Sequence, residues 1–201
     1  MIGLAFPFDD RVDALLVVPP HTQVHDIAWW CSEMALGDVI AVTGIVLTIV
    51  FFLLNRPRMA ASIFFVGLTS SITGLAAALL KDVFGRTRPT NHLVPQGVYG
   101  LWHDGHWIIN KAAFGSFPSG HSASAVGLAA AAWLVHRGWG TVAAVYALAV
   151  MWSRIALEAH HLSDVVASTV LSIPLAILMK QVLAPKIEFQ FDKLHRSKQV
   201  R

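Results

Sequence analysis

A polar stretch between two apolar segments holds the residues best suited to chemistry. Arg154, His160 and Asp164 lie within the sequence SRIALEAHHLSD. If the chain is helical here, His160 and Asp164 are one turn apart and share a face. The Asp164 carboxylate can then bond one imidazole nitrogen and leave the other aimed at a substrate. Charged groups so near hydrocarbon are costly, which favours a functional interpretation over a purely structural one.

Two earlier polar clusters supply groups that bind anions. They contain a lysine, an arginine, a serine, a glycine and a histidine, namely Lys81, Arg88, Ser119, Gly120 and His121. Arginine binds phosphate through a planar fork, and lysine binds it as a point charge. A loop that opens a helix offers free N–H groups to the same anion. Together with Arg154, these residues form a set that could surround a phosphoryl group in transfer.

The two histidines can divide the work of phosphoryl transfer. One must attack phosphorus, and the other must protonate the leaving oxygen. His160 is the better nucleophile because Asp164 follows at helical spacing. His121 has no carboxylate at that spacing, so we assign it as the general acid.

The composition indicates an integral membrane protein. Of the 201 residues, 55% are hydrophobic and only 13% are charged, and the mean hydropathy is +0.59. Soluble domains carry about 25% charged residues. No cleavable signal peptide is evident at the N-terminus, and the single cysteine, Cys31, excludes an intrachain disulfide.

Five apolar segments favour an all-α polytopic membrane helix bundle. They run from about Val39 to Leu54, Met59 to Leu80, Ser119 to Val135, Trp139 to Leu157 and Leu162 to Met179. Helices are the expected spanning form because each satisfies its own backbone hydrogen bonds. Small residues at four-residue spacing also permit close packing of helices, as at Gly67 and Ser71, Ser70 and Gly74, and Ala123 and Gly127.

The domain prediction has three parts. Residues 1–35 form an interfacial segment with short helices near Ala14–Val18 and Ile27–Met34, or contain a sixth span despite their charges. Residues 36–184 form the transmembrane domain, with loop 90–117 on the face of the polar clusters. Residues 185–201 form a basic tail, which we expect either to be solvated or to touch anionic headgroups.

Charge distribution predicts the orientation in the membrane. With five spans, one face holds nine lysine and arginine residues against two acidic residues, and the other holds six against ten. The positive-inside rule places the first face, with the C-terminal tail, in the cytoplasm. All three polar clusters then share the extracytoplasmic face, at what we expect to be a bacterial inner membrane.

The three clusters resemble the signature motifs of the type 2 phosphatidic acid phosphatase family. The matching patterns are Lys81-x6-Arg88-Pro89, Pro118-Ser119-Gly120-His121 and Ser153-Arg154-x5-His160-x3-Asp164. The resemblance implies a metal-independent phosphatase, without a cofactor, that acts through a phosphohistidine. The same motifs occur in soluble vanadium-dependent haloperoxidases, and the apolar segments weigh against that branch.

The resemblance also implies a role for each matched residue. His160 is the nucleophile, Asp164 orients it and His121 is the general acid. The phosphoryl oxygens are bound by Lys81, Arg88, Ser119, the Gly120 amide and Arg154. His161 and Leu162 depart from the family pattern, in which an aromatic residue and a proline often follow this histidine, and His161 could compete for Asp164.

Several neighbouring residues admit a plainer interpretation. Asp82 and Arg86 are expected at the surface or behind the site, and Glu158 either pairs with a cation or faces water. His103 and His106 have metal-ligand spacing, but no further ligand set completes a site, so we expect a solvated loop.

The predicted function is hydrolysis of a lipid phosphate or diphosphate at the extracytoplasmic face. Undecaprenyl diphosphate is the first candidate, and phosphatidylglycerophosphate, phosphatidate and lipid A phosphate are alternatives. The partners are then the bilayer and the lipid substrate, with no nucleic acid. The rival from another class is an anion or phosphate transporter, which would show paired repeats and charges at the midplane of the membrane. The sequence shows neither.

Overall fold

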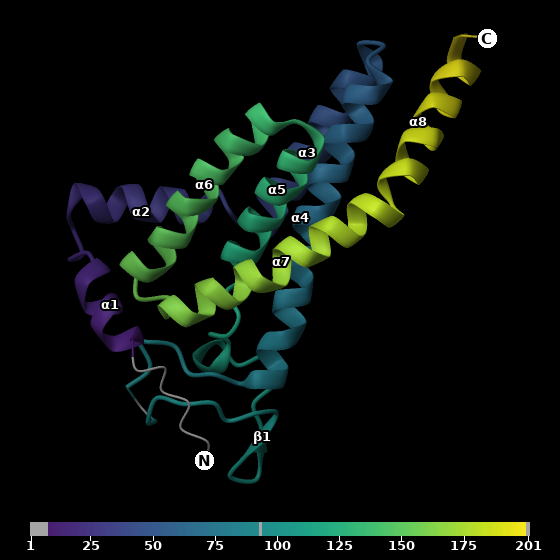
Figure 1. Cartoon of the computed structure of the whole chain (residues 1–201). Helices are drawn as coiled ribbons and strands as arrows, with labels where there is room; N and C mark the ends of the chain where they lie inside the picture. The colour runs from purple at the N-terminus through teal and green to yellow at the C-terminus, as the bar shows by residue number, and fades with distance from the viewer. Residues whose placement is uncertain (1–7, 93, 200–201) are drawn as a thin grey trace.

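The computed structural model describes residues 8–92 and 94–199, and these residues are mostly helical. Five helices correspond to the five apolar segments: α3 (Gly37–Leu53), α4 (Pro57–Phe84), α5 (Gly120–Val135), α6 (Arg137–Ala156) and α7 (Leu162–Val182). Figure 1 shows them packed as a bundle, with α4 as its longest member. The prediction of an all-α membrane helix bundle is confirmed.

Fewer helices than the expected five are both long enough and apolar enough to cross a membrane. Within the described residues, α4, α6 and α7 are long and apolar enough to cross a membrane. The helices α2 (Gln23–Glu33) and α3 pass the same test together but are bent by 58°, which gives up to four spans. The apolar helix α5 has only 16 residues, so it falls below the roughly 20 that usually span hydrocarbon.

Helix α5 lies at the centre of the bundle, and hydroxyl groups from its neighbours hold it there. Ser70 and Thr73 of α4 donate hydrogen bonds to the carbonyls of Ser124 and Ala123, at 2.8 and 2.9 Å. Ser172 of α7 donates to the Ala123 carbonyl from the other side, at 3.0 Å. Small and hydroxyl side chains let backbones approach closely where lipid supplies no hydrophobic drive.

The predicted small-residue positions are contact points between helices. A Cβ atom built on Gly127 would lie 2.1 Å from Thr73 Oγ1, and one on Gly74 would lie 2.2 Å from Ser124 Oγ. A Cβ built on Gly67 would lie 3.6 Å from the Gly44 Cα of α3, which is an ordinary van der Waals contact. Glycine is therefore required at 127, where three Thr73 atoms lie within 3 Å, whereas at 74 a Cβ would displace the Ser124 hydroxyl.

The N-terminal segment folds as short helices, although the first begins earlier than predicted. Helix α1 spans Asp9–Leu16 instead of beginning near Ala14, and Pro19-Pro20 separates it from α2. Thr22 caps α2 by accepting a hydrogen bond from the His25 N–H at 3.2 Å. Figure 1 shows α1 near the lower ends of α6 and α7, and α2 crossing α6.

The C-terminal tail is a helix that packs on the bundle. Helix α8 spans Ala184–Gln199, and Phe191 contacts Phe52 and Phe64 with ring centroids 5.9 and 5.8 Å apart. Its cytoplasmic location stays a prediction. At the opposite end, strands β1 (Trp102–His103) and β2 (His106–Trp107) form a hairpin around Asp104-Gly105, both with positive φ. Asp-Gly favours this turn because glycine tolerates positive φ.

The contact between α4 and α5 predicts the effect of a single methyl group. Gly127→Ala places a Cβ against the hydrogen-bonded Thr73 side chain, so we expect a loss of about 1–3 kcal/mol, as for overpacked cores. The thermal unfolding temperature of the detergent-solubilised protein should fall. Gly37→Ala is the control, because nothing lies within 4 Å of its added Cβ. Equal unfolding temperatures for the two variants would contradict this packing.

Candidate active site

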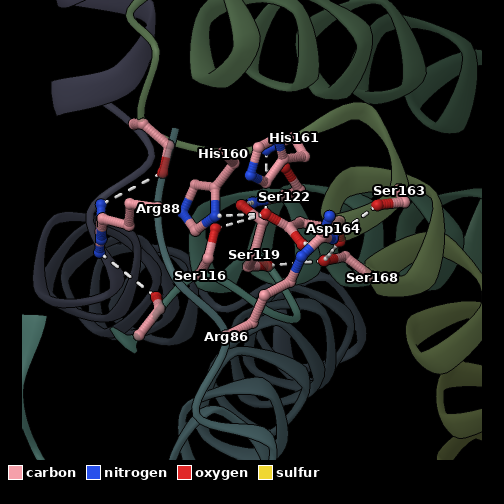
Figure 2. Close-up of polar contacts among 12 residues, drawn as sticks. Arg86, Arg88, Ser116, Ser119, Ser122, His160, His161, Ser163, Asp164 and Ser168 are labelled. Carbon is pink, nitrogen blue, oxygen red and sulfur yellow. Dashed lines mark hydrogen bonds and ion pairs between the residues drawn. The ribbon is translucent and has the colours of Figure 1, made fainter. Parts of the chain in front are cut away.

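The Asp164 carboxylate is the point at which the polar side chains of the site converge. Its side chain is fully buried in the first turn of α7. Arg86 donates to Oδ1 at 2.5 Å, while Ser116 Oγ and the His161 N–H donate to Oδ2 at 2.5 and 2.9 Å. Figure 2 shows Arg86, Ser116 and His160 directed toward this group. Several donors to one buried carboxylate stabilise its ionised form.

His160 lies in the turn between α6 and α7. The sequence alone allows one continuous helix from His160 to Asp164, and the structure does not have one. Its imidazole is 1% exposed, and Nδ1 lies 3.5 Å from Asp164 Oδ2. The turn is fixed because the Ala159 and His160 N–H groups both donate to the Arg154 carbonyl at 3.1 Å. The expected pairing of histidine and carboxylate is therefore present, although a turn and not a helical face produces it.

The environment of His160 favours the neutral imidazole. Burial, helped by the positive charges of Lys81 and Arg154 and opposed by Asp164, lowers its pKa from 6.5 to about 4. A neutral ring that directs one N–H toward Asp164 keeps a lone pair on Nε2. Both ring nitrogens are buried without a hydrogen-bond partner among residues 8–92 and 94–199, and Nδ1 is the one that faces Asp164, at 3.5 Å.

Three cations surround this histidine from different elements. Lys81 lies in the last turn of α4, and its Nζ would lie 3.5 Å from a Cβ built on Gly120. Arg88 follows α4 and donates to the carbonyls of Ala112 and Ala159 at 2.9 and 3.4 Å. Burial lowers the pKa of Arg88 from its ordinary value. Cations held so closely, with part of their hydration removed, favour a bound anion.

Arg154 is buried near the end of α6 and is tied to the N-terminal segment. Its guanidinium hydrogen-bonds Ser32 Oγ of α2. Its Nε is buried with no hydrogen-bond partner in the described part of the chain, and the same is true of Ser122 Oγ in α5. Buried polar atoms without partners are expensive, so both fit a site that an oxyanion completes.

Helix α5 directs its N-terminus at the site. Ser119 is its N-cap, accepts a hydrogen bond from the Ser122 N–H at 3.4 Å and donates its own N–H to the Asp164 carbonyl at 3.2 Å. The first N–H groups of a helix have no partner within the helix, and the dipole there favours negative charge. Gly120 and His121 occupy this first turn, and His121 interacts electrostatically with His160.

His161 does not compete with His160 for Asp164. Its Nδ1 lies 2.8 Å from Asp13 Oδ2, so α1 holds the ring, and the backbone N–H of His161 is the group that donates to the Asp164 carboxylate. The departure from the family pattern is therefore accommodated by an acidic residue of the N-terminal segment. Glu158 is exposed and Asp82 accepts a hydrogen bond from the Asn110 N–H at 2.8 Å, as expected for residues outside the site.

The sequence did not reveal three residues that contact this network. Ser116 bonds Asp164 directly, Arg86 bridges Asp164 to Asp9, and Asp9 is 3% exposed in α1. Arg86 was expected at the surface or behind the site, and the structure buries it behind the site. The position of Arg86 between Lys81 and Arg88 was the one signal in the sequence for a role at the site. Its partner Asp9 is 77 residues away in the sequence.

All eight site residues predicted from the sequence therefore lie at one end of the bundle. A buried neutral histidine, an ionised carboxylate behind it, three cations and a helix N-terminus can together bind a phosphoryl group and attack its phosphorus. A second histidine, His121, interacts electrostatically with His160 from the first turn of α5.

The chain is similar to proteins of one known family. Residues 58–188 match the model of the PAP2 superfamily. The lipid A 1-phosphatase of Rhizobium etli is 36% identical over 100 residues, which are 49% of this chain and 40% of that protein. The chain thus matches less than half the length of this curated relative.

Two solved structures share the fold. Aquifex aeolicus LpxE gives a TM-score of 0.60 at 19% identity and covers 90% of this chain and 99% of its own. The PAP2 type phosphatidylglycerolphosphate phosphatase of Bacillus subtilis gives 0.65 at 19% identity and covers 88% of this chain and 84% of its own. At this identity the two structures show the shared fold, and the match to the family model covers more than half of the chain. This chain belongs to the PAP2 superfamily.

Proposed function

We propose that this chain is a metal-independent lipid phosphatase that forms a phosphohistidine at His160. The observation that carries the proposal is the buried His160 ring, whose Nε2 has no hydrogen-bond partner among the described residues. Its other nitrogen faces an ionised carboxylate, and cations surround the ring. A nucleophile needs this combination: a free lone pair, a group that orients it and charges that stabilise the phosphoryl oxygens.

The reaction follows from the positions of the two histidines. The phosphoryl oxygens lie among Lys81, Arg88 and Arg154, which offset the charge of the transition state. A bond forms between His160 Nε2 and phosphorus while the bond from phosphorus to the lipid oxygen breaks. His121 gives its proton to that oxygen, then accepts one from the water that attacks the phosphohistidine and releases phosphate.

The substrate is a phosphorylated membrane lipid, because the site lies at the ends of apolar helices. Lipid A 1-phosphate becomes the first substrate to test, since the Rhizobium etli relative is named for it. Phosphatidylglycerophosphate follows, because the Bacillus subtilis neighbour of similar fold is named for it. Undecaprenyl diphosphate and phosphatidate complete the panel, which also separates monophosphate from diphosphate preference.

The proposed orientation puts the site outside the cytoplasm and α8 inside, in a bacterial inner membrane. We expect a membrane-impermeant maleimide to label Asp104→Cys, in the exposed hairpin, in intact cells. Ser197→Cys in α8 should be labelled only after the membrane is opened, and both variants are made in a Cys31→Ala background. The reverse labelling pattern would refute the orientation.

Loss of the nucleophile should abolish turnover. We expect His160→Ala to lower kcat at least about 1,000-fold, as when a nucleophile is removed, with the purified protein and a lipid phosphate panel. Wild-type turnover should persist in chelator and stop with vanadate, whose five-coordinate form resembles the transition state.

Two controls separate this mechanism from its rivals. His103→Ala, in the loop hairpin, should keep wild-type turnover. An anion transporter would release no phosphate under any condition, and a metal-dependent enzyme would lose turnover in chelator. Substantial turnover by His160→Ala would rule out the assigned nucleophile.

The lowered pKa of His160 predicts activity far into the acid range. Protonated imidazole cannot attack phosphorus, so activity is present above this pKa and is lost as pH falls through it. Once corrected for ionisation of the substrate, kcat/KM should decline near pH 4, where His160 titrates. A decline near the ordinary value of 6.5 would indicate that water reaches the ring.

A further inference from the structure

The N-terminal segment bridges the two helices that flank His160. The Val18 N–H donates to the Ala156 carbonyl at the end of α6, at 3.1 Å. Asp13 and Asp9 accept hydrogen bonds from the first N–H groups of α7, those of Leu162 and Ser163, at 3.2 and 2.9 Å. Residues 9–18 thus span the turn that carries the nucleophile.

Asp9 also shares the guanidinium of Arg86 with Asp164. Arg86 Nη2 donates to Asp9 Oδ2 at 2.7 Å, while Nη1 donates to Asp164 Oδ1 at 2.5 Å. Ser163 Oγ joins the network by donating to Asp9 Oδ2 and accepting from Arg86 Nη1, both at 2.6 Å. The side chains of Asp9 and Arg86 are each 5% exposed, so water screens these charges little.

We propose that Asp9 is a positioning residue for catalysis, which acts through Arg86 to keep the Asp164 carboxylate oriented toward His160 and able to support it. This inference rests on the proposed function in taking His160 as the nucleophile. Asp9 has no role in contacting the substrate.

The physical reason is a division of charge. Arg86 stands between two carboxylates, and Asp9 offsets part of its positive charge. Without Asp9, the full charge acts on Asp164, which then attracts the proton on His160 Nδ1 less strongly. The His160 ring becomes a weaker base and a weaker nucleophile, and the phosphohistidine, which carries positive charge on the ring, becomes harder to form.

Other charges also act on the ring and set the background for a change at Asp9. They come from α4, the segment after it, α5, α6 and α7, and from His161 with its α1 partner: Lys81, Arg86, Arg88, His121, Arg154, Asp164, His161 and Asp13. Every substitution below leaves these groups in place except where Arg86 itself is changed.

The test compares Asp9→Asn with Asp10→Asn, its exposed neighbour in α1. Both remove one negative charge, but Asp10 is exposed to solvent. We expect Asp9→Asn to lower kcat about 10- to 100-fold, as when a group that orients a functional side chain is lost. KM should stay within about twofold, because uniform binding is unchanged.

The pH profile separates positioning from a structural defect. With substrate ionisation corrected, the acid limb, which is the decline of kcat/KM at low pH, should move to lower pH by at least about half a unit in Asp9→Asn. The reason is that the positive charge of Arg86 is no longer offset by Asp9. Simple loosening of α1 would let water reach His160 and move the limb upward, toward 6.5. Asp9→Glu should restore most of kcat, because it keeps the charge.

A double variant tests whether Asp9 acts through Arg86. Asp9→Asn leaves a buried cation partly unbalanced, whereas Asp9→Asn with Arg86→Gln removes both charges. Arg86→Gln alone should lower kcat because Asp164 loses a donor, and adding Asp9→Asn should lower kcat little further because the group through which Asp9 acts is already absent. Double-mutant coupling near zero would overturn the proposal.

The outcomes distinguish this inference from the proposed function. If Asp9→Asn matches Asp10→Asn in kcat and in acid limb while His160→Ala is inactive, Asp9 has no positioning role and the nucleophile stands. If His160→Ala is active, the proposed function fails whatever Asp9 does.

Discussion

The buried Asp164 carboxylate is the group on which the site depends. An ionised carboxylate out of water is stable only when donors and cations replace its hydration. Arg86, Ser116 and the His161 N–H do this here, at 2.5–2.9 Å. These donors come from the segment after α4, the loop before α5 and the start of α7. Their hydrogen bonds to one carboxylate therefore hold these three parts of the chain together beside His160.

The bundle satisfies a second constraint, which is to hold three cations close together. Lys81 and Arg154 lie in the last turns of α4 and α6, and Arg88 follows α4, where backbone carbonyls accept its hydrogen bonds. Helix α5 contributes its N-terminus to the same place, and hydroxyl groups from α4 and α7 fix its position. Such a preorganised arrangement gains most when an oxyanion arrives, because little has to move.

The sequence was informative about the elements and the reacting groups, because both leave local patterns. Hydropathy located α3 to α7, and the spacing within three motifs predicted eight candidate site residues, which the structure brings to one end of the bundle. Contacts between distant residues leave no local pattern. Asp9 meets Arg86 across 77 residues, and α1 therefore looked only interfacial. The short hairpin did leave a signal, since Asp104-Gly105 stands between aromatic residues. Whether α8 packs or stays solvated depended on Phe191 finding Phe52 and Phe64, which composition does not show.

The central claim is that the phosphoryl group passes through His160. Rapid mixing of enzyme with a lipid phosphate labelled in its phosphoryl group, followed by an alkaline quench, tests it directly. Phosphohistidine survives alkali and is lost in acid, and His121→Ala should prolong its lifetime by slowing hydrolysis. We expect peptide mapping to find the label on Nε2 of His160. Label on another residue, or turnover without any labelled protein, would contradict it.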